Sequence, residues 1–262
     1  MKALVFTGSC PRHLDLLNRL STCMDRVYAV VEVAENARTH TGARDRGDPA
    51  LTRYFACMEE AEKAVFGNIG FPLPNVTVLP IPFGALDTIP LAEIKGIVDE
   101  CNIVIVFGSS WIRGDLFDAI APKDPVNIHM GVSPYYKGSS CNFWAIYDMH
   151  PQLVGATIHR LAPEIDAGGV LYHVFPVGGG DSFAFGMRAV LAAQLCLCEK
   201  VASREIFRVE PLAQDQSKNI RTTRRDEFTG DVALQFMARC AEPVIVPGHD
   251  GYGLVRPQFM HC

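Results

Sequence analysis

Short apolar runs alternate with longer helical patterns through the first hundred residues, and this alternation constrains the fold more than any other feature. Runs rich in β-branched residues predict buried strands at 2–7, 26–33, 76–81 and 102–107, and helical spacing predicts helices at 12–20 and 91–100. Strands that alternate with helices pair in parallel through right-handed crossovers. The sequence therefore predicts an α/β fold with a doubly wound, mostly parallel sheet.

The rhythm changes in the second half of the chain. We expect strands at 126–130, 155–161 and 169–175, a short helix at 142–149, and a long helix at 183–206 capped by Asp181 or Ser182. Residues 207–262 are mixed and punctuated by proline, with a short helix expected at 231–240 and a hairpin near 244–255. This tail is too short for a substantial independent domain. We therefore expect a main domain, 1–206, and a C-terminal extension, 207–262, packed on it.

Two segments have no fixed place in this scheme. Residues 35–49 are polar, and 51–66 have helical spacing with Tyr54 and Met58 on the apolar side, which predicts a flap or a helix over the sheet edge. For 36–49 a disordered loop is the equal alternative. In the tail, Phe228, Phe236 and Phe259 are candidates for exposed aromatic side chains. They could form a homodimer surface or close over an active site.

Composition excludes several classes of protein. With 262 residues, 48% of them hydrophobic, the chain can bury a full core. Its formal charge of −5 comes from interspersed acidic and basic residues, which does not suggest a nucleic-acid-binding surface. The N-terminal apolar run breaks at Gly8, too early for a secretory signal, and no stretch approaches the ~18–20 uncharged apolar residues of a membrane helix. We expect a cytoplasmic protein that binds neither nucleic acid nor a membrane.

Three further motifs bear on metal or phosphate binding. The nine cysteines lack paired spacing, as in proteins with reduced thiols, and Cys196 and Cys198 lie on different faces of a predicted helix, so we expect core residues and no metal site. The glycine run 178–180 lacks the lysine and the spacing of a phosphate loop and predicts a flexible turn. A basic cluster is formed by Arg221, Arg224 and Arg225. It could meet a substrate phosphate or lie solvated near Asp226 and Glu227.

Polar side chains that could carry chemistry follow the predicted strand at 126–130. Residues two apart in a strand point to the same side, so Asn127 and His129 project together, away from Val126 and Ile128. The carboxyl ends of parallel strands are the usual ligand crevice. Asp166 lies in a tight loop before two glycines and could reach His129. From spacing alone, a satisfied strand asparagine and a core histidine are the favoured interpretation.

An asparagine, a histidine and an aspartate suit acyl-type transfer. The amide of Asn127 can stabilise an oxyanion. His129 can take the proton of an attacking amine, or donate to the oxyanion when protonated. A carboxylate beside it, from Asp166, favours the imidazolium and fixes its orientation.

Three separated motifs, in the same order, resemble those of the folate-dependent formyltransferase family. They are Asn127-Ile128-His129 with Pro134-Tyr135-Tyr136-Lys137-Gly138, then Gly155-Ala156-Thr157-Ile158-His159, and then Ile165-Asp166-Ala167-Gly168-Gly169-Val170-Leu171. The resemblance is strongest over 102–176. The family includes methionyl-tRNA formyltransferase, glycinamide ribonucleotide transformylase and the sugar-nucleotide N-formyltransferases.

This resemblance implies a Rossmann-like catalytic domain, 10-formyl-tetrahydrofolate as formyl donor, and Asn127, His129 and Asp166 as catalytic residues. It also implies that the pterin end of the cofactor lies near the backbone of a set of residues comprising Ser110, Trp111, Ile112, Arg113 and Ile165. For Trp111, core packing is the alternative. One departure is the loop after the histidine: relatives carry Pro-Ser-Leu-Leu-Pro, whereas this chain has Met-Gly-Val-Ser-Pro at 130–134. Contacts inferred from the usual serine therefore do not carry over.

Length, charge and this loop also favour one acceptor class. A methionyl-tRNA enzyme would carry a longer C-terminal domain and a basic surface, a glycinamide ribonucleotide enzyme would be more compact, and a formyl-tetrahydrofolate hydrolase would begin with a regulatory domain. A nucleotide-linked 4-amino-4,6-dideoxy sugar fits best. The whole chain looks most similar to the GDP-perosamine N-formyltransferases of lipopolysaccharide O-antigen synthesis. A folate-binding module without activity is the alternative from a different class.

Overall fold

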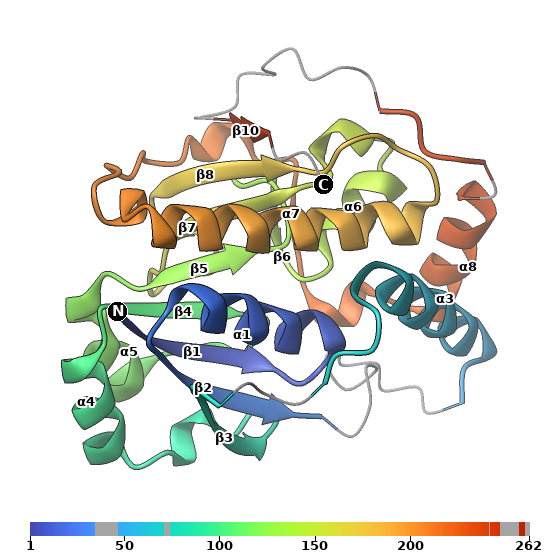
Figure 1. Cartoon of the computed structure of the whole chain (residues 1–262). Coiled ribbons are helices and arrows are strands. Elements are labelled where there is room, and N and C mark those ends of the chain that lie inside the picture. Colours follow the sequence, from blue (N-terminus) through green and yellow to red (C-terminus); the bar gives the residue numbers. More distant parts are fainter. Residues whose placement is uncertain (35–46, 71–73, 241, 247–256, 260–262) are drawn as a thin grey trace.

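The central feature is an eight-stranded sheet with strand order β10-β8-β7-β5-β4-β1-β2-β3 (Figure 1). The computed structural model describes residues 1–34, 47–70, 74–240, 242–246 and 257–259. Five neighbouring strands are parallel: β1 (Lys2–Gly8), β2 (Arg26–Val33), β3 (Val76–Pro82), β4 (Ile103–Phe107) and β5 (Val126–His129). Strand β7 (Ala156–Arg160) runs antiparallel to both β5 and β8 (Val170–Phe175). The predicted doubly wound, mostly parallel sheet is confirmed.

Helices cover both faces of the sheet. Helices α1 (Pro11–Cys23) and α7 (Ser182–Ala202) pack on one face, and α4 (Leu91–Glu100) and α5 (Gly114–Ile120) on the other. In β1, Ala3 and Val5 point to the first face while Leu4 and Phe6 point to the second. A central parallel strand is buried on both sides and is therefore apolar throughout, which made these strands recognisable.

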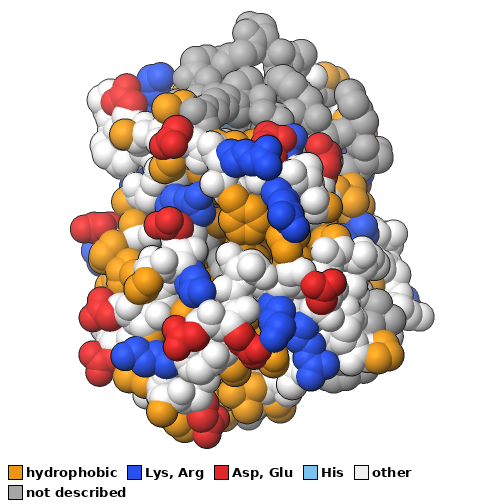
Figure 2. All heavy atoms as spheres, turned by 60° about the vertical axis from the view of Figure 1, so that its left-hand side comes forward, with side chains coloured by type: hydrophobic (Ala, Val, Ile, Leu, Met, Phe, Trp, Pro, Cys, Tyr) orange, Lys and Arg blue, Asp and Glu red, His pale blue; other side chains and the backbone are white. Residues whose placement is uncertain are grey.

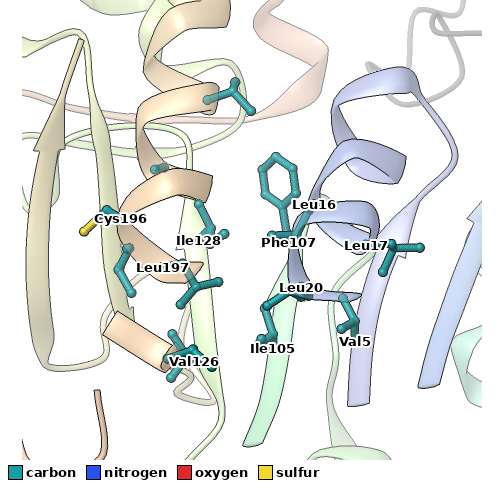
Figure 3. Close-up of a cluster of buried hydrophobic side chains, with 14 of the residues drawn as sticks. Val5, Leu16, Leu17, Leu20, Ile105, Phe107, Val126, Ile128, Cys196 and Leu197 are labelled. Carbon is teal, nitrogen blue, oxygen red and sulfur yellow. The ribbon is translucent and has the colours of Figure 1, made fainter. Parts of the chain in front are cut away.

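The core beneath α1 and α7 joins the two helices to β1, β4 and β5. Figure 3 shows part of it, with these labelled side chains: Val5, Leu16, Leu17, Leu20, Ile105, Phe107, Val126, Ile128, Cys196 and Leu197. Cys196 is fully buried there, as predicted. The eight described cysteines are all free thiols.

Helix α7 has the expected start but a different end. The Asp181 carboxylate caps it by accepting a hydrogen bond from the Ala184 N–H at 2.8 Å. The helix ends at Ala202, and not at 206, because Arg204 adopts a left-handed conformation with φ 62°. By length and composition α7 could cross a membrane, but 56% of that window is buried inside the protein, as in a core helix.

Residues 49–66 form a helix, as predicted over 51–66. Helix α3 (Pro49–Phe66) starts where the Asp48 carboxylate accepts hydrogen bonds from the N–H groups of Ala50 and Leu51 at 2.7 and 3.3 Å. It packs against α7, α1 and α8 (Gly230–Arg239). In Figure 1, α3 lies beyond the carboxyl ends of β1 and β2, and its main partners are helices, so it does not cover an edge strand of the sheet. Of the predicted loop at 36–49, residues 36–46 lie outside the described residues.

The expectation that Phe228 and Phe236 are exposed is wrong. They are 6% and 2% exposed, and their rings contact Tyr54 and Phe143, with centroid distances of 4.9 Å (Tyr54–Phe228) and 4.4 Å (Phe143–Phe236). The apolar side of α8 packs on α3 and α6 (Cys141–Tyr147), and that packing removes both rings from solvent. The side chain of Phe259 lies outside the described residues.

The C-terminal extension contacts the main domain at several places. Strand β9 (Arg221–Thr223) pairs in parallel with β6 (Tyr136–Gly138), and β10 (Pro257–Phe259) pairs with β8. Val244 forms an isolated bridge with Gly180, but residues 247–256 of the predicted hairpin lie outside the described residues. The short 3-10 helices are η1 (Leu86–Thr88), η2 (Ala121–Lys123), η3 (Pro151–Leu153), η4 (Glu205–Phe207), η5 (Gln216–Lys218) and η6 (Arg225–Glu227). On the face in Figure 2, basic and acidic side chains are intermixed.

Candidate active site

Strand β5 presents Asn127 and His129 on one side, as the sequence predicted. Val126 and Ile128, on the opposite side, are 0% and 3% exposed and belong to the core beneath α7. His129 is 6% exposed and Asn127 is half-buried. Both polar side chains line a cavity beyond the carboxyl end of the strand.

The loop between β7 and β8 brings Asp166 to His129. The carboxylate oxygen Oδ2 of Asp166 lies 3.2 Å from Nδ1 of His129 and accepts a hydrogen bond from the Gly138 N–H at 2.9 Å. Asp166 adopts a left-handed conformation with φ 49°, which aspartate tolerates better than most residues. The structure therefore assembles all three residues proposed from the sequence.

His159 completes the cluster, although the sequence reading gave it no role. In the antiparallel pairing of β5 with β7, His159 stands directly opposite Asn127. Its Nε2 lies 3.0 Å from the Asn127 side-chain nitrogen and 3.7 Å from Oδ1 of Asp166. Its Nδ1 donates to the Arg160 carbonyl oxygen at 2.7 Å, so a neutral His159 offers the Nε2 lone pair to the Asn127 amide. The available signal was the alternation of β7, which places His159 on a defined side, but the pairing partner of β7 was unknown.

Burial and neighbouring groups shift the pKa values of Asp166 and His129 in this cluster. Burial raises the pKa of Asp166, but the neighbouring His129 and His159 and the Gly138 N–H outweigh it and hold the pKa of that carboxyl well below its usual range. Burial lowers the pKa of His129, and the attraction of Asp166 only partly offsets this. Asp166 thus favours the imidazolium, as expected, but desolvation of the charged ring is the larger effect and leaves the pKa of His129 below its usual value.

A cavity of about 380 Å³ opens above these residues. The ends of β4 and β5 form its base, α1 contributes Arg12 and His13, and α3 contributes Tyr54 and Met58. Arg225, from the C-terminal extension, also lines it. Cavities of roughly 300–1,000 Å³ at the carboxyl ends of parallel strands are typical small-molecule sites.

The residues expected near the cofactor follow β4. Trp111 and Ile165 are each 54% exposed, so core packing is wrong for Trp111, whereas Ile112 is 3% exposed and packs in the core with α4 and α5. Ser110 Oγ donates to the fully buried carboxylate of Glu32 at 2.7 Å, which fixes the loop. The Arg113 guanidinium lies over the Trp111 ring at 5.4 Å. Their role in cofactor binding stays a prediction.

The basic cluster divides into separate environments. Arg221 pairs with Asp148 at 3.0 and 3.1 Å and lies over the Trp144 ring at 4.2 Å, which ties β9 to α6. Arg224 is exposed and lies outside the cavity lining, whereas Arg225 borders the cavity.

Two of the further motifs that bear on metal or phosphate binding can be located in the structure. The chain bends at Gly178 before α7, but Gly180 pairs with Val244 in an isolated bridge, so the predicted flexible turn is found only in part. Within the described part of the chain, no group of three or more histidine, cysteine, aspartate or glutamate side chains could hold a metal ion.

Comparison with known proteins identifies solved structures that resemble this chain. No family model and no curated protein matches the sequence. A 4-N formyltransferase from Francisella tularensis shares 14% identity over 99% of this chain and 97% of its own, with a TM-score of 0.52. The N-formyltransferase from Helicobacter canadensis, solved with folinic acid and dTDP-3-aminofucose, shares 14% identity over 90% of this chain and 79% of its own, with a TM-score of 0.54.

A phosphoribosylglycinamide formyltransferase from Anaplasma phagocytophilum shares 17% identity over 81% of this chain and 92% of its own, with a TM-score of 0.53. These three solved structures share the same parallel sheet architecture despite their low sequence identity to this chain. At such identities structural likeness establishes the fold, and this chain accordingly has the formyltransferase fold.

Proposed function

We propose that this protein is an N-formyltransferase that moves the formyl group of 10-formyl-tetrahydrofolate to the amine of a nucleotide-linked 4-amino-4,6-dideoxy sugar. The observation that carries the proposal is the meeting of Asn127, His129 and Asp166 at the base of one cavity, with His129 3.2 Å from Asp166. These are the residues that the resemblance to the formyltransferase family identifies as catalytic.

Each residue has a chemical task in this reaction. The cofactor supplies the formyl group, and attack of a neutral amine on it develops negative charge on the formyl oxygen. One N–H of the Asn127 amide points at His159, which leaves the second N–H to donate to that oxygen. His129 accepts the proton that the amine loses, and Asp166 orients the imidazole through Nδ1.

The residues predicted to bind the cofactor do not line the cavity themselves but adjoin Ser109 and Asp166, which do, and they suit a folate donor. A flat apolar ring system needs apolar surface together with backbone hydrogen-bonding groups, and Trp111 and Ile165 expose apolar side chains beside two loops that follow β4 and β7. The bond between Ser110 and the buried Glu32 holds the first loop in place. The solved Helicobacter canadensis relative, which holds folinic acid, supports this choice of donor.

Charge in the cavity favours an anionic acceptor. Arg12 and Arg225 line it, and Asp166 is its one acidic lining residue within the described part of the chain. Arg12 is paired with Glu62 at 2.9 Å, whereas Arg225 forms no ion pair with any described residue and lies over the Phe83 ring at 5.3 Å. A cation available beside the amine-binding region suits the diphosphate of a sugar nucleotide.

The finer assignment rests on the resemblance of the whole chain. That resemblance is to the GDP-perosamine N-formyltransferases, which gives GDP-perosamine as acceptor and a role in lipopolysaccharide O-antigen synthesis in the cytoplasm as the finer proposal. The similar structure from Francisella tularensis is a 4-N formyltransferase, which supports an amine at the sugar 4-position. Formation of a homodimer stays a prediction, and Phe228 and Phe236 are not part of it, because both are buried.

The test is an acceptor panel. The protein is incubated with 10-formyl-tetrahydrofolate and GDP- or dTDP-linked 4-amino sugars, glycinamide ribonucleotide or charged initiator tRNA, and product mass is followed. We expect a gain of one formyl mass on an amino-sugar nucleotide, and a loss of ~100-fold or more in turnover for Asn127→Ala. Formylation of another acceptor would move the protein to that branch. Folate binding without transfer to any amine would favour a binding module.

A further inference from the structure

The C-terminal extension reaches the loop that carries Asp166 through one side chain. The side-chain nitrogen of Gln214 lies 2.7 Å from the Asp166 carbonyl oxygen and 2.7 Å from the Gly168 carbonyl oxygen. Both partners are acceptors, so the group that faces them must be the NH₂ of the amide. The other end of the amide, Oε1, is buried and accepts no hydrogen bond from the described residues. Gln214 is therefore oriented by these two bonds alone.

The loop that Gln214 holds is tightly confined. A Cβ on Gly168 would collide with the Arg160 carbonyl oxygen, and a Cβ on Gly169 would lie 2.7 Å from Pro211. Next to it, Val170 and Leu212 exchange backbone hydrogen bonds of 2.8 and 2.9 Å. The extension thus runs along the loop and packs closely against its backbone.

The same extension also holds the second group that fixes the Asp166 carboxylate. That carboxylate accepts a hydrogen bond from the Gly138 N–H, and Gly138 is the last residue of β6. Strand β6 is paired with β9 of the extension, and a Cβ on Gly138 would collide with the Thr223 carbonyl oxygen. The backbone of Asp166 and the donor to its side chain are therefore both held from residues 207–223.

We propose that Gln214 is a positioning residue for the catalytic carboxylate: its two hydrogen bonds fix the backbone of 166–168 so that Asp166 stays against Nδ1 of His129. Asp166 in a left-handed conformation has a neighbouring right-handed or extended alternative, and loss of the Gln214 bonds would let the loop relax toward it. The kinetic part of this proposal rests on the proposed transfer reaction. The extension then belongs to the active site and is not an accessory to a complete 1–206 domain.

Two variants and one matched control test this role in the full chain. Gln214→Leu removes both donors and the unpaired Oε1 at similar size, and Gln214→Glu keeps the shape but replaces the donors by a carboxylate. Asn219→Ala is the control, because the Asn219 amide, in the same segment, donates to the carbonyl oxygens of Pro134 at 2.9 Å and Arg221 at 3.4 Å, and among the described residues it forms no hydrogen bond with the Asp166 loop. Neutral hydrogen bonds of this kind predict a fall in kcat of about tenfold to a hundredfold for both Gln214 variants, with the acceptor KM little changed.

A second measurement does not depend on turnover. NMR titration of the histidine ring protons, assigned with a His129→Gln variant, gives the pKa of His129 in each protein. Asp166 raises that pKa, so displacement of the carboxylate in Gln214→Leu, which adds no charge, should lower it further, whereas Asn219→Ala should leave it unchanged. A His129 pKa in Gln214→Leu and a kcat in both Gln214 variants that match the control would overturn the proposal. If the wild type transfers formyl to no amine, the proposed function fails, and the titration alone still decides the role of Gln214.

Discussion

His159 offers the sharpest test of how the proposed catalytic cluster is oriented, through the substitution His159→Phe. The side chain is 1% exposed and stands opposite Asn127 across the β5–β7 pairing. Phenylalanine fills the space of the imidazole ring but has no ring nitrogens. The variant therefore keeps Asn127, His129 and Asp166 and removes only the groups that orient two of them.

The expected loss follows from the hydrogen bonds that disappear. The Asn127 amide loses its 3.0 Å bond to Nε2, and a buried donor without a partner costs about 1–3 kcal/mol. If that amide turns away from the formyl oxygen for the same free energy, kcat falls by roughly 5- to 150-fold. Complete loss of an oxyanion donor costs about 100- to 1,000-fold, which sets the upper bound because Asn127 is still present.

The assay compares His159→Phe with a second buried histidine changed in the same way. His173, on the neighbouring strand β8, is 0% exposed and lies 2.7 Å from the Ser133 carbonyl oxygen, so His173→Phe matches the loss of a buried ring nitrogen. Both variants should unfold at lower temperature than the wild type, but only His159→Phe should lose kcat at saturating substrates. A kcat within twofold of that of His173→Phe would refute an orienting role for His159.

Three further predictions follow from the charges and the core. Arg225→Gln should raise the KM of a nucleotide-linked acceptor about tenfold while leaving the KM of the free amino sugar unchanged. Arg224→Gln, at the neighbouring residue outside the cavity lining, should change neither KM. Equal effects of the two substitutions would remove Arg225 from the acceptor site. The rate of transfer should rise with pH along a limb whose midpoint lies below the ordinary histidine pKa of ~6.5, because burial lowers the pKa of His129 and the base must be neutral; a midpoint above ~6.5 in the pH–rate profile would contradict this. Leu20→Ala, in the fully buried core of α1, should destabilise the protein by about 2–5 kcal/mol and lower its melting temperature by roughly 5–15 °C at unchanged kcat; a shift of less than ~2 °C in thermal unfolding would contradict the packing seen there.

The parallel half of the fold was predictable because its strands are apolar on both faces. Strands such as β1 and β4 pack against helices on either side, so their sequences are continuous apolar runs. The alternation of β5 likewise predicted that Asn127 and His129 share one side, since strand side chains alternate with a period of two. These inferences need only local sequence, and for that reason they held.

The missed features depend on which segments meet. The sequence of β7 does not indicate that this strand pairs antiparallel with β5. That pairing places His159 against Asn127. The three-residue strands β6, β9 and β10 are too short to show any periodicity. Phe228 and Phe236 looked exposed because the partners that bury them, on α3 and α6, lie far away in the chain.

The ring of a neutral His129 has one N–H donor for two neighbouring acceptor oxygens, and this bears on the order of steps in the proposed reaction. Nδ1 of His129 faces Asp166 at 3.2 Å and Nε2 faces the Tyr136 carbonyl oxygen at 3.0 Å, so both ring nitrogens face acceptors. A neutral imidazole can donate to only one of them, and burial keeps the ring neutral by lowering its pKa. In the proposed transfer, a proton taken from the amine gives both oxygens a donor, so the site would stabilise the ring most strongly once attack has begun. Because that charge arises only then, the proposed reaction requires the Asn127 amide, which His159 orients, to meet the oxyanion first.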